Sequence, residues 1–483
     1  MSSPVPMIRT RLSAMMFLQF FLWASWYVPV GGYANGALGF TGPQIGWLYA
    51  STALGAIISP MFVGLIADRF FATERVLAVL HLIGGGCLLA ASQQRDFWPL
   101  MILLLVNALA FMPTLGLTNS LAFRNIDDPN RFSRIAVWGT IGWIVSGLLV
   151  DFALGGLKPG SFFFLAGGGG IAMAIYSLTL PHTPPKGGDG GDVLGLRALQ
   201  LLKDPSFLVF AVCAFLISIP LTFYFQWGNA FLTETDRPKP TALMTLCQVS
   251  EIVVMIIMPW FIGRIGLKNV LVIGMGAWAI RYILFASLSF PLIILGLLVH
   301  GFCYCFVFVA SFIYVSKKAP PEMSASAQSL VALLMWGVGM FVGTQLAGWT
   351  GQEYPPAVTI TALKNGEKQP DQLLPPWKTE QGDGLAKALG AAEKDSVSVS
   401  AIDALPESGF KLGELSYSKD EVRAAATKAD KNNDGTLTYE EWQGVRPHNW
   451  PPIWLWPGAL AAVVCVLFLL GGRDAGEPIK SEG

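Results

Sequence analysis

Residues 241–262 read TALMTLCQVSEIVVMIIMPWFI, a stretch that is apolar enough and long enough to cross a bilayer as one helix. Glu251 falls at its centre. A carboxylate costs several kcal/mol to bury at mid-membrane, so it normally faces a water-filled cavity or a partner. Gln248 lies three residues earlier, on the same helical face. The stretch therefore predicts a membrane helix that contacts a transported solute or a proton.

Most of the chain shares this apolar character. Of its 483 residues, 53% are hydrophobic and 13% are charged, whereas soluble globular proteins carry about 25% charged residues. The shortage of charge predicts a protein that crosses the membrane many times and is surrounded by lipid. Because the net charge is zero, we expect no nucleic acid among its partners. We also expect a monomer.

Apolar segments of about 20 residues, the length that crosses a bilayer, recur along the chain. They fall near 12–35, 44–67, 75–93, 97–119, 135–155, 160–180, 206–229, 241–262, 268–288, 290–315, 325–348 and 452–471. The pattern predicts an all-α membrane protein with about twelve transmembrane helices. A P-x-F-x-G motif ends the second and the eighth of these segments, at 60–64 and 259–263, which predicts two six-helix pseudo-repeats.

The segments between the spans divide the chain. We predict an N-terminal half at 1–181, a cytoplasmic linker rich in Pro and Gly at 182–205, and a C-terminal half at 206–350 and 452–472, interrupted by a polar insert at 351–451. Sixteen Lys and Arg residues fall on the side of the N-terminus, and four fall in the short loops on the other side. The positive-inside rule therefore predicts cytoplasmic termini and an extracytoplasmic insert.

The insert contains the stretch DKNNDGTLTYEE at 430–441, which matches the calcium-binding EF-hand loop at every ligand position. The predicted Ca²⁺ ligands are side-chain oxygens of Asp430, Asn432 and Asp434, the carbonyl of Thr436 and the carboxylate of Glu441. Extracellular calcium modules bind weakly, with dissociation constants of about 10⁻⁴–10⁻³ M, and are normally full. We therefore expect a structural ion that folds the insert, and regulation by calcium stays open as an alternative.

Several strings resemble those of the major facilitator superfamily and, within it, the bacterial nucleoside:proton symporters of the nucleoside permease family. GLIADR at 64–69 resembles the signature loop of the superfamily. The more specific strings are FLQFFLWASW at 17–26, FMPTLGLTN at 111–119, WGTIG at 138–142, QVSE at 248–251, GLKNV at 266–270, AIR at 279–281 and SASAQ at 324–328. The resemblance implies the major facilitator fold, a central cavity, a nucleoside substrate, proton-driven symport by alternating access, and the bacterial inner membrane.

The resemblance also implies substrate-binding roles. Gln248 and Glu251 match family residues that contact the nucleoside or the proton pathway, so Glu251 is our candidate for proton coupling. Thr140 matches a ligand contact in the fifth span, and Trp143 stands where the family has an aromatic residue that packs on the ligand. Tyr304 is a further candidate, because aromatic faces suit flat ligands.

Other polar residues within spans have competing interpretations. Gln19 in the first span is a further candidate for substrate contact. Asp68 and Arg69 are expected to act in gating, at the cytoplasmic interface between spans. The structural alternative for Glu251 is an ion pair with Arg281, because charges within membranes often pair. His300 could relay a proton, since its charge changes near neutral pH.

The chain departs from the family at several polar positions. Ala136 stands where the family has an arginine, and Cys305 stands where it has an aspartate. Thr222 and Phe225 replace a glutamine and an asparagine. These departures keep two alternatives open: a transporter of a sugar or another small polar metabolite, and a non-transporting, calcium-responsive receptor. The sequence contains no catalytic constellation that would favour an enzyme.

Overall fold

The computed structural model describes residues 5–69, 71–126, 132–154, 160–185, 196–364, 366–377, 384–391, 395–412, 415–474 and 476. The side chains of residues 5–6, 60–69, 322, 364, 367 and 369–373 are outside this description. The predicted gating residues Asp68 and Arg69 and the first P-x-F-x-G motif belong to this second group. Their roles therefore stay predictions.

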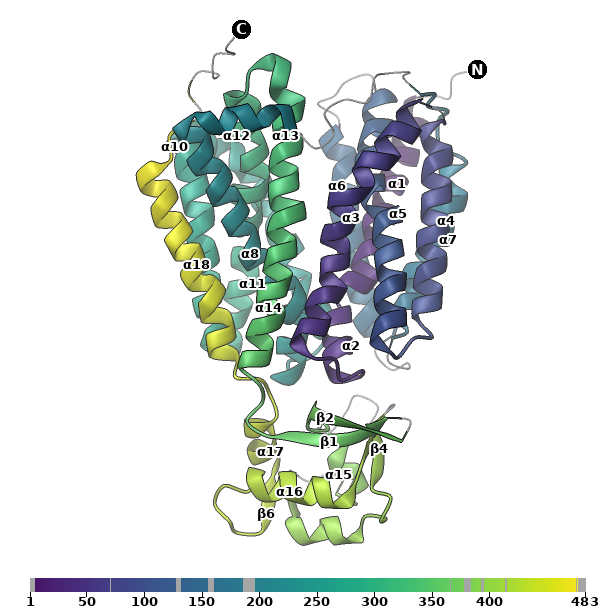
Figure 1. Cartoon of the computed structure of the whole chain (residues 1–483), viewed down its shortest axis with the longest axis vertical. Coiled ribbons are helices and arrows are strands. Elements are labelled where there is room, and N and C mark those ends of the chain that lie inside the picture. Colours follow the sequence, from purple (N-terminus) through teal and green to yellow (C-terminus); the bar gives the residue numbers. More distant parts are fainter. Residues whose placement is uncertain are drawn as a thin grey trace.

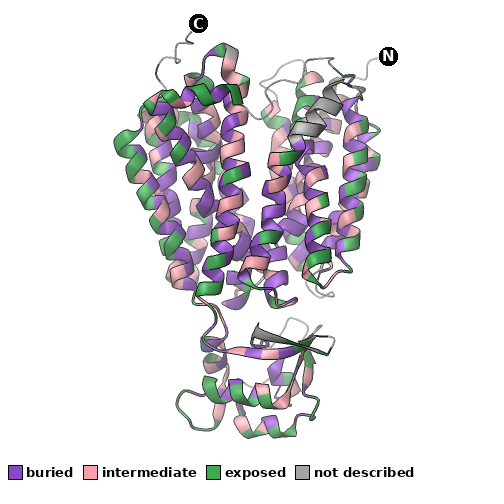
Figure 2. Cartoon of the chain, viewed as in Figure 1, coloured by how far each residue is buried: buried purple, intermediate pink, exposed green. Residues whose placement is uncertain are grey.

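The first part of the chain folds into one bundle of helices (Figure 1). Its helices are α1 (Val5–Tyr27), the short α2 (Val30–Gly36), α3 (Gly42–Arg69), α4 (Thr73–Ala91), α5 (Phe97–Arg124), α6 (Phe132–Phe152) and α7 (Phe162–Ser177). Helix α1 packs against α6 and α7, α4 packs against α5 and α7, and α3 packs against α5. Buried residues line the helix faces that meet one another, and many large apolar side chains remain exposed on the outer faces, as expected for helices surrounded by lipid (Figure 2).

The second part forms another bundle beside the first. It begins with the 3₁₀-helix η2 (Leu196–Lys203), and its further helices are α8 (Pro205–Glu234), the short α9 (Pro240–Met244), α10 (Leu246–Ala286), α11 (Phe290–Tyr304), the π-helical η3 (Cys305–Val309), α12 (Ala310–Lys318), the 3₁₀-helix η4 (Pro321–Met323), α13 (Ser324–Ala332), the π-helical η5 (Leu333–Gly339), α14 (Met340–Glu353) and α18 (Trp450–Gly471). Helix α10 packs against α11 and α18, and α8 packs against α14 and α18.

Helix α10 consists of two helical legs. They join at Gly266, whose φ of 80° lies in the left-handed region that glycine enters at little steric cost. Asp474, which follows α18, accepts a hydrogen bond from the backbone N of Lys268 at 3.0 Å and so caps the start of the second leg. The two legs match the predicted spans at 241–262 and 268–288.

Nine helices within the described residues are long and apolar enough to span a membrane, and Pro240–Ala286 is one of them. Of the remaining predicted spans, the one at 44–67 coincides with α3 and the one at 160–180 coincides with the shorter α7. The prediction of an all-α membrane protein with about twelve transmembrane helices in two bundles is confirmed.

The chain between α14 and α18 forms a separate small domain, which we call the insert domain (Figure 1). An antiparallel sheet has the strand order β2-β1-β5-β4, with β1 (Thr359–Lys364), β2 (Glu367–Leu373), β4 (Phe410–Leu412) and β5 (Leu415–Tyr417). A second sheet pairs β3 (Ser396–Ser398) with β6 (Thr436–Thr438). The helical segments are α15 (Leu385–Ala388), η6 (Val399–Ala404), α16 (Lys419–Ala429) and α17 (Tyr439–Val445). The insert domain has its own hydrophobic core, which includes Trp377 and Trp442.

The two bundles meet at the end that carries the insert domain, which we call the insert end. The Nδ2 atom of Asn35 on α2 donates to Oε1 of Glu234, the last residue of α8, at 2.5 Å. Oδ2 of Asp151 on α6 accepts from the backbone N of Ala242 on α9 at 2.7 Å. Both contacts join the first bundle to the second. The bundles diverge toward the opposite end, where α1 begins and α18 ends, and which we call the termini end (Figure 1).

Helices α3 and α14 also approach closely at the insert end. An added methyl group at this contact should therefore disturb the packing of the two helices. A Cβ atom at Gly348 would lie 2.6 Å from the carbonyl oxygen of Gly42. We expect Gly348→Ala to destabilise the closed insert end by about 1–3 kcal/mol, which corresponds to a roughly 5- to 150-fold shift of the conformational equilibrium. Thiol labelling of a cysteine placed at the insert end measures this shift.

The matched control is Gly36→Ala, because a Cβ atom there would meet open space. Equal labelling rates in the Gly348→Ala and Gly36→Ala proteins would contradict the idea that contact between α3 and α14 closes this end.

Candidate functional site

A cavity of about 670 Å³ lies between the two bundles. It lies within the range of about 300–1,000 Å³ that is usual for small-molecule sites. Its aromatic lining is Phe20, Trp23, Tyr304, Phe308, Phe312 and Trp336, and its polar lining is Thr52, Asn119 and Ser316. Asn119 and Ser316 lie near the last turns of α5 and α12, so the cavity extends from the middle of the bundles toward the termini end. Flat aromatic faces with a few polar groups suit a flat, partly polar solute.

Two π-helical segments shape the wall of this cavity on the side of the second bundle. Phe308 and Val309 belong to η3, and Trp336 belongs to η5. Phe308 stacks on Tyr304 with ring centroids 5.4 Å apart, and Trp336 lies 5.2 Å from Phe308. Single π-helical turns inside α-helices are frequent at functional sites. Here they place two aromatic rings, Phe308 and Trp336, on one surface with Tyr304 of α11.

Gln248 and Trp143 line a second, much smaller cavity of about 10 Å³ between the bundles. Phe225 also lines it, and it extends to residues on α1 and α9. The ring of Trp143 lies edge-on to Trp23 at 5.4 Å, and Trp23 lines the central cavity. Thus Trp143 and Trp23 stand between the small cavity and the central one. Gln248 is buried in this conformation.

Glu251 reaches Arg281 through a third residue. Its Oε1 atom lies 2.9 Å from Nε2 of His300 on α11, and Nδ1 of His300 lies 2.6 Å from a terminal nitrogen of Arg281. His300 and Arg281 are fully buried, and the side chain of Glu251 is 17% exposed. The direct Glu251–Arg281 ion pair, which was one interpretation of the sequence, is replaced by this chain of three residues, which we call the buried triad.

The direction of its hydrogen bonds follows from the chemistry of the groups. A guanidinium group only donates hydrogen bonds, so Nδ1 of His300 must accept from Arg281. The ring proton of a neutral imidazole then sits on Nε2 and is donated to the carboxylate of Glu251. A second proton on His300 would break the contact with Arg281. Protonation of Glu251, in contrast, leaves the hydrogen bond from Arg281 to His300 intact. Glu251 is therefore the residue of the triad that can take up a proton.

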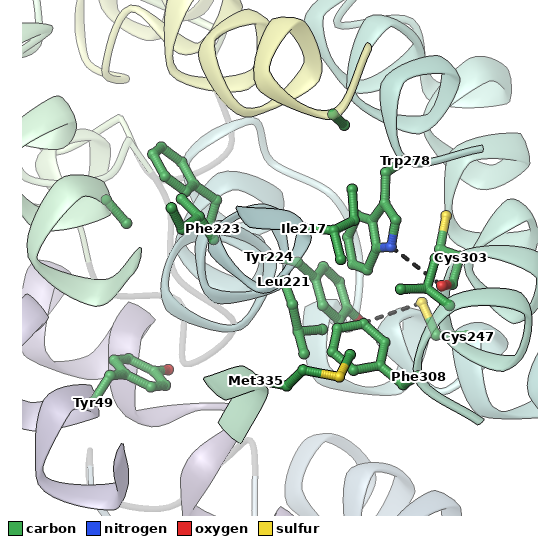
Figure 3. Packing of buried hydrophobic residues seen from close by; sticks show 14 of the residues in the cluster. Tyr49, Ile217, Leu221, Phe223, Tyr224, Cys247, Trp278, Cys303, Phe308 and Met335 are labelled. Atoms are coloured by element: carbon green, nitrogen blue, oxygen red, sulfur yellow. Dashed lines mark hydrogen bonds between the residues drawn. The ribbon is translucent and has the colours of Figure 1, made fainter. Parts of the chain in front are cut away.

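Aromatic faces surround the guanidinium group of Arg281. Its central carbon lies 4.0 Å from the ring centroid of Tyr224, 5.1 Å from that of Phe285 and 5.3 Å from that of Trp278. The hydroxyl of Tyr224 donates to the sulfur of Cys247, and Nε1 of Trp278 donates to a backbone carbonyl (Figure 3). Cation–π attraction can reach about 2 kcal/mol per ring when the groups are desolvated. The cation is therefore stabilised even when Glu251 is neutral.

Tyr304 connects the triad to the central cavity. Its ring stacks on His300 at 6.0 Å between centroids, and it lines the cavity. Cys305, the next residue, donates its thiol to the backbone carbonyl of Glu251 at 3.6 Å. A solute in the cavity would thus lie against a ring that packs on the triad. The central cavity and the buried triad therefore adjoin at Tyr304.

The remaining candidates lie elsewhere. Gln19 is buried in the first bundle, where its Nε2 donates to Oγ1 of Thr114 at 2.7 Å and its Oε1 is left without a partner. Thr140 is half-buried on α6 and lines neither cavity. Gln226 points to α14: in the orientation that satisfies its amide, it donates to the carbonyl of Thr344 at 3.1 Å and accepts from the backbone of Gly348 at 3.2 Å.

Sequence reasoning missed several lining residues. Trp23, Phe308 and Trp336 occur in apolar runs, where aromatic residues usually serve packing. Periodicity gives no sign of the π-helical turns that turn Phe308 and Trp336 toward the cavity. Asn35 and Glu234, which join the bundles, lie at the ends of helices far apart in the sequence.

The calcium-loop motif adopts part of an EF-hand geometry. Oδ2 of Asp430 accepts from the backbone N of Gly435 at 3.0 Å, and Gly435 has a φ of 76°, which a glycine permits. Asp430 is only 7% exposed, and its Oδ1 atom has no partner. Oδ1 of Asn432 accepts from the backbone of Asp434 at 2.9 Å. These residues fit a cation that would occupy the unpaired side of Asp430.

The last predicted ligand, Glu441, is hydrogen-bonded to Thr438 and does not point into the loop. Oε2 of Glu441 accepts from the backbone N and the hydroxyl of Thr438, at 3.0 and 2.8 Å, in a capping box at the start of α17. Accordingly, no three acidic, His or Cys side chains gather as a metal cluster within the described residues. Filling the loop requires the carboxylate of Glu441 to turn from Thr438 toward the ion.

Two helical bundles, joined at one end and enclosing a cavity open toward the other, define a membrane transporter of the alternating-access class. The family model described as nucleoside H⁺ symporter matches residues 7–358. The chain belongs to this nucleoside H⁺ symporter family. Its transporter character agrees with the sequence prediction, which did not favour an enzyme.

Relatives support this assignment. The chain is 42% identical to the protein YegT of Escherichia coli (strain K12) over 354 residues, which cover 70% of this chain and 83% of the relative. It is 33% identical to the xanthosine permease of the same organism over 368 residues, 71% of this chain and 87% of the relative. The crystal structure of the nucleoside transporter NupG has the same fold, with a TM-score of 0.71 at 24% identity, covering 96% of this chain and 98% of that one.

The buried triad predicts strong coupling between its two charged ends. We expect Arg281→Gln to lower stability by about 3–5 kcal/mol, because it leaves Glu251 without a buried counter-charge. Adding Glu251→Gln should recover part of this loss, since the double variant holds no unpaired charge. Apparent Tm values in detergent are measured for the wild type, both single variants and the double variant. These four proteins form a double-mutant cycle, which gives the interaction between Glu251 and Arg281.

Arg264→Gln is the control, because Arg264 is exposed on the first leg of α10. Strict additivity of the two single effects would show that Glu251 and Arg281 do not interact through His300.

Proposed function

We propose that this protein imports nucleosides into the bacterial cell by proton symport, through alternating access. One observation carries the proposal: the aromatic cavity between the bundles ends on Tyr304, whose ring stacks on the His300 that is hydrogen-bonded to Glu251. A site for a flat solute and a site for a proton therefore adjoin. Membership in the nucleoside H⁺ symporter family supports both the cargo and the coupling ion.

Binding of the solute begins in the central cavity. The base of a nucleoside stacks among aromatic rings such as Trp336 and Tyr304, and Asn119 offers an amide to its polar groups. Trp143 and Gln248 line the small cavity beyond Trp23. Rocking of the bundles would enlarge this small cavity and bring Gln248 to the solute from the insert end. Gln19, with its unpartnered oxygen, and Thr140 stay candidates for contact in that state.

The proton resides on Glu251. When the carboxylate is charged, it accepts from His300 and balances Arg281. When it is protonated, the aromatic rings around Arg281 retain the remaining cation. Arg281 therefore fixes the tautomer of His300, and His300 orients Glu251. Because Cys305 stands at the position of a second acid in the family pattern, Glu251 carries the coupling in this chain.

The orientation proposed here places the termini end in the cytoplasm and the insert domain outside it. The excess of Lys and Arg in the segments on the side of the termini supports this orientation. The cavity then faces the cytoplasm in the present conformation, which is the state that releases imported solute. The protein is a multi-pass membrane protein, and we place it in the inner membrane as a monomer.

We also propose that the insert domain binds Ca²⁺ at the 430–441 loop. The unpaired, buried Oδ1 atom of Asp430 supports a cation at this loop, together with Asn432, Asp434 and the carbonyl of Thr436. Glu441 would complete the shell after leaving Thr438. When bound, the ion supplies a rigid link between α16 and α17. It takes no direct part in moving the solute.

Uptake measurements test the transport proposal. In proteoliposomes, labelled uridine or adenosine should accumulate when the outside is more acidic than the lumen. Glu251→Gln should abolish accumulation driven by the pH gradient and retain exchange of internal for external nucleoside, since a neutral side chain needs no proton to cross. Glu353→Gln, an exposed carboxylate at the end of α14, is the control. Accumulation that ignores the pH gradient would refute coupling.

A ligand panel tests the cargo against the sugar alternative, which the substitutions at Ala136, Thr222 and Phe225 motivate. Phe225 lines the small cavity with an apolar ring. Nucleosides should raise the apparent Tm of the purified protein, because a ligand at about 100 times its Kd stabilises by about 2.7 kcal/mol. Trp336→Ala should weaken this shift. Stabilisation by hexoses or disaccharides and not by nucleosides would favour the sugar alternative.

A further inference from the structure

The insert domain contacts the bundles through the same helix that follows its calcium loop. The hydroxyl of Tyr439, the first residue of α17, donates to Oδ2 of Asp236 at 2.5 Å. Arg446, which follows α17, lies 3.9 Å from Oδ1 of the same carboxylate. Asp236 stands just beyond the end of α8, at the insert end.

A second contact lies two residues away, at Glu234. The backbone N of His448 donates to Oε2 of Glu234 at 2.9 Å, and Nδ1 of its ring lies 3.0 Å from the carboxylate. The other partner of Glu234 is Asn35 of the first bundle, at 2.5 Å. The carboxylate is 2% exposed. One buried side chain therefore joins the second bundle, the first bundle and the segment that leaves the insert domain.

These contacts form a short path from the calcium loop to the contact between the bundles. Glu441, the last predicted ligand, lies within the first turn of α17, as does Tyr439. Strand β6, inside the loop, is held by β3 through the pair Val397 and Leu437. A change in the position of Glu441 therefore acts on a helix whose start and end both contact the chain just after α8. The contact between Asn35 and Glu234 joins the two bundles at the closed insert end.

We propose that calcium bound by the 430–441 loop clamps α17 against the end of α8 and thereby favours the closed insert end. An ion shifts a conformational equilibrium only by binding one state more tightly than the other. Here the difference arises because Glu441 and Tyr439 share the first turn of α17, so an ion that holds Glu441 also holds the turn that places Tyr439 against Asp236. This proposal rests on the alternating-access function and calcium site proposed above. It predicts that external calcium slows the return of the empty carrier.

Distances between the bundles test the clamp without any transported solute. Spin labels are placed at Gly36→Cys on α2 and Thr233→Cys on α8, both exposed positions at the insert end, after the half-buried Cys87 and Cys465 are changed to Ser. About 2 mM calcium, which exceeds the Kd range of extracellular modules, should increase the ratio of the short-distance to the long-distance population at least about fivefold, the lower end of typical coupling between sites. An unchanged distance distribution would overturn the clamp.

Two variants separate binding of calcium from its effect. Glu441→Gln should remove both the calcium-induced rise in apparent Tm and the change in distance, whereas the neighbouring exposed Glu440→Gln should retain both. Tyr439→Phe should retain the rise in Tm and lose most of the change in distance, because it removes only the hydroxyl that holds Asp236. A full distance response in Tyr439→Phe would overturn the proposed path.

Nucleoside uptake distinguishes failure of the clamp from failure of the proposed function. In the wild type, calcium outside should reduce the rate of uptake at least about fivefold, and Glu441→Gln should be insensitive to it. Robust uptake that ignores calcium, together with unchanged distances, would refute the clamp and leave the transport function standing. Distances that respond to calcium in a protein that transports no nucleoside would support the clamp and refute the transport function.

Discussion

The withdrawal of one guanidinium group and one carboxylate into the apolar interior of the second bundle constrains much of this structure. Arg281 cannot lose its charge, so the surrounding helices must supply partners for it. Rings of Tyr224, Trp278 and Phe285 supply attraction over its faces, and His300 accepts one of its hydrogen bonds. The same imidazole then donates to Glu251. The groups that offset the cost of burying these charges come from three helices, α8, α10 and α11.

This arrangement gives the titratable carboxylate a defined partner and a defined position. A lone carboxylate at mid-membrane would take whichever proton state its surroundings allowed. In the buried triad, the contact of His300 with Arg281 keeps the imidazole neutral, so uptake of a proton changes the charge of Glu251 and not that of His300. Tyr304 lies between this group and the solute cavity. Coupling between solute and proton then needs only a change in the packing of one aromatic ring.

The insert domain adds a second polar junction at the insert end. Glu234 holds Asn35 and His448 at once, so closure of the bundles and docking of the insert share one carboxylate. The sequence motif at 430–441 led to the expectation of a structural ion that folds the insert. The contact of Tyr439 with Asp236 also places the start of α17 against the chain just after α8. A domain that could have been an appendage is therefore placed where it can influence the conformational cycle.

The sequence by itself determined the membrane class and the placing of nearly every span, because hydropathy acts over segments of about 20 residues. The family and its two-bundle fold were implied by the resemblance of specific strings, such as those at 17–26 and 248–251. The sequence also singled out Glu251 and Gln248, since a polar group in an apolar run stands out without any structure. The sequence did not reveal how Glu251 is bound. His300 and Arg281 were considered as separate residues, and a direct ion pair between Glu251 and Arg281 was one interpretation. The structure instead places His300 between them. The π-helical turns that present Phe308 and Trp336, and the junction of Asn35 with Glu234, were likewise decided by the tertiary structure. These features depend on contacts between helices far apart in the chain, whose geometry no local pattern of residues encodes.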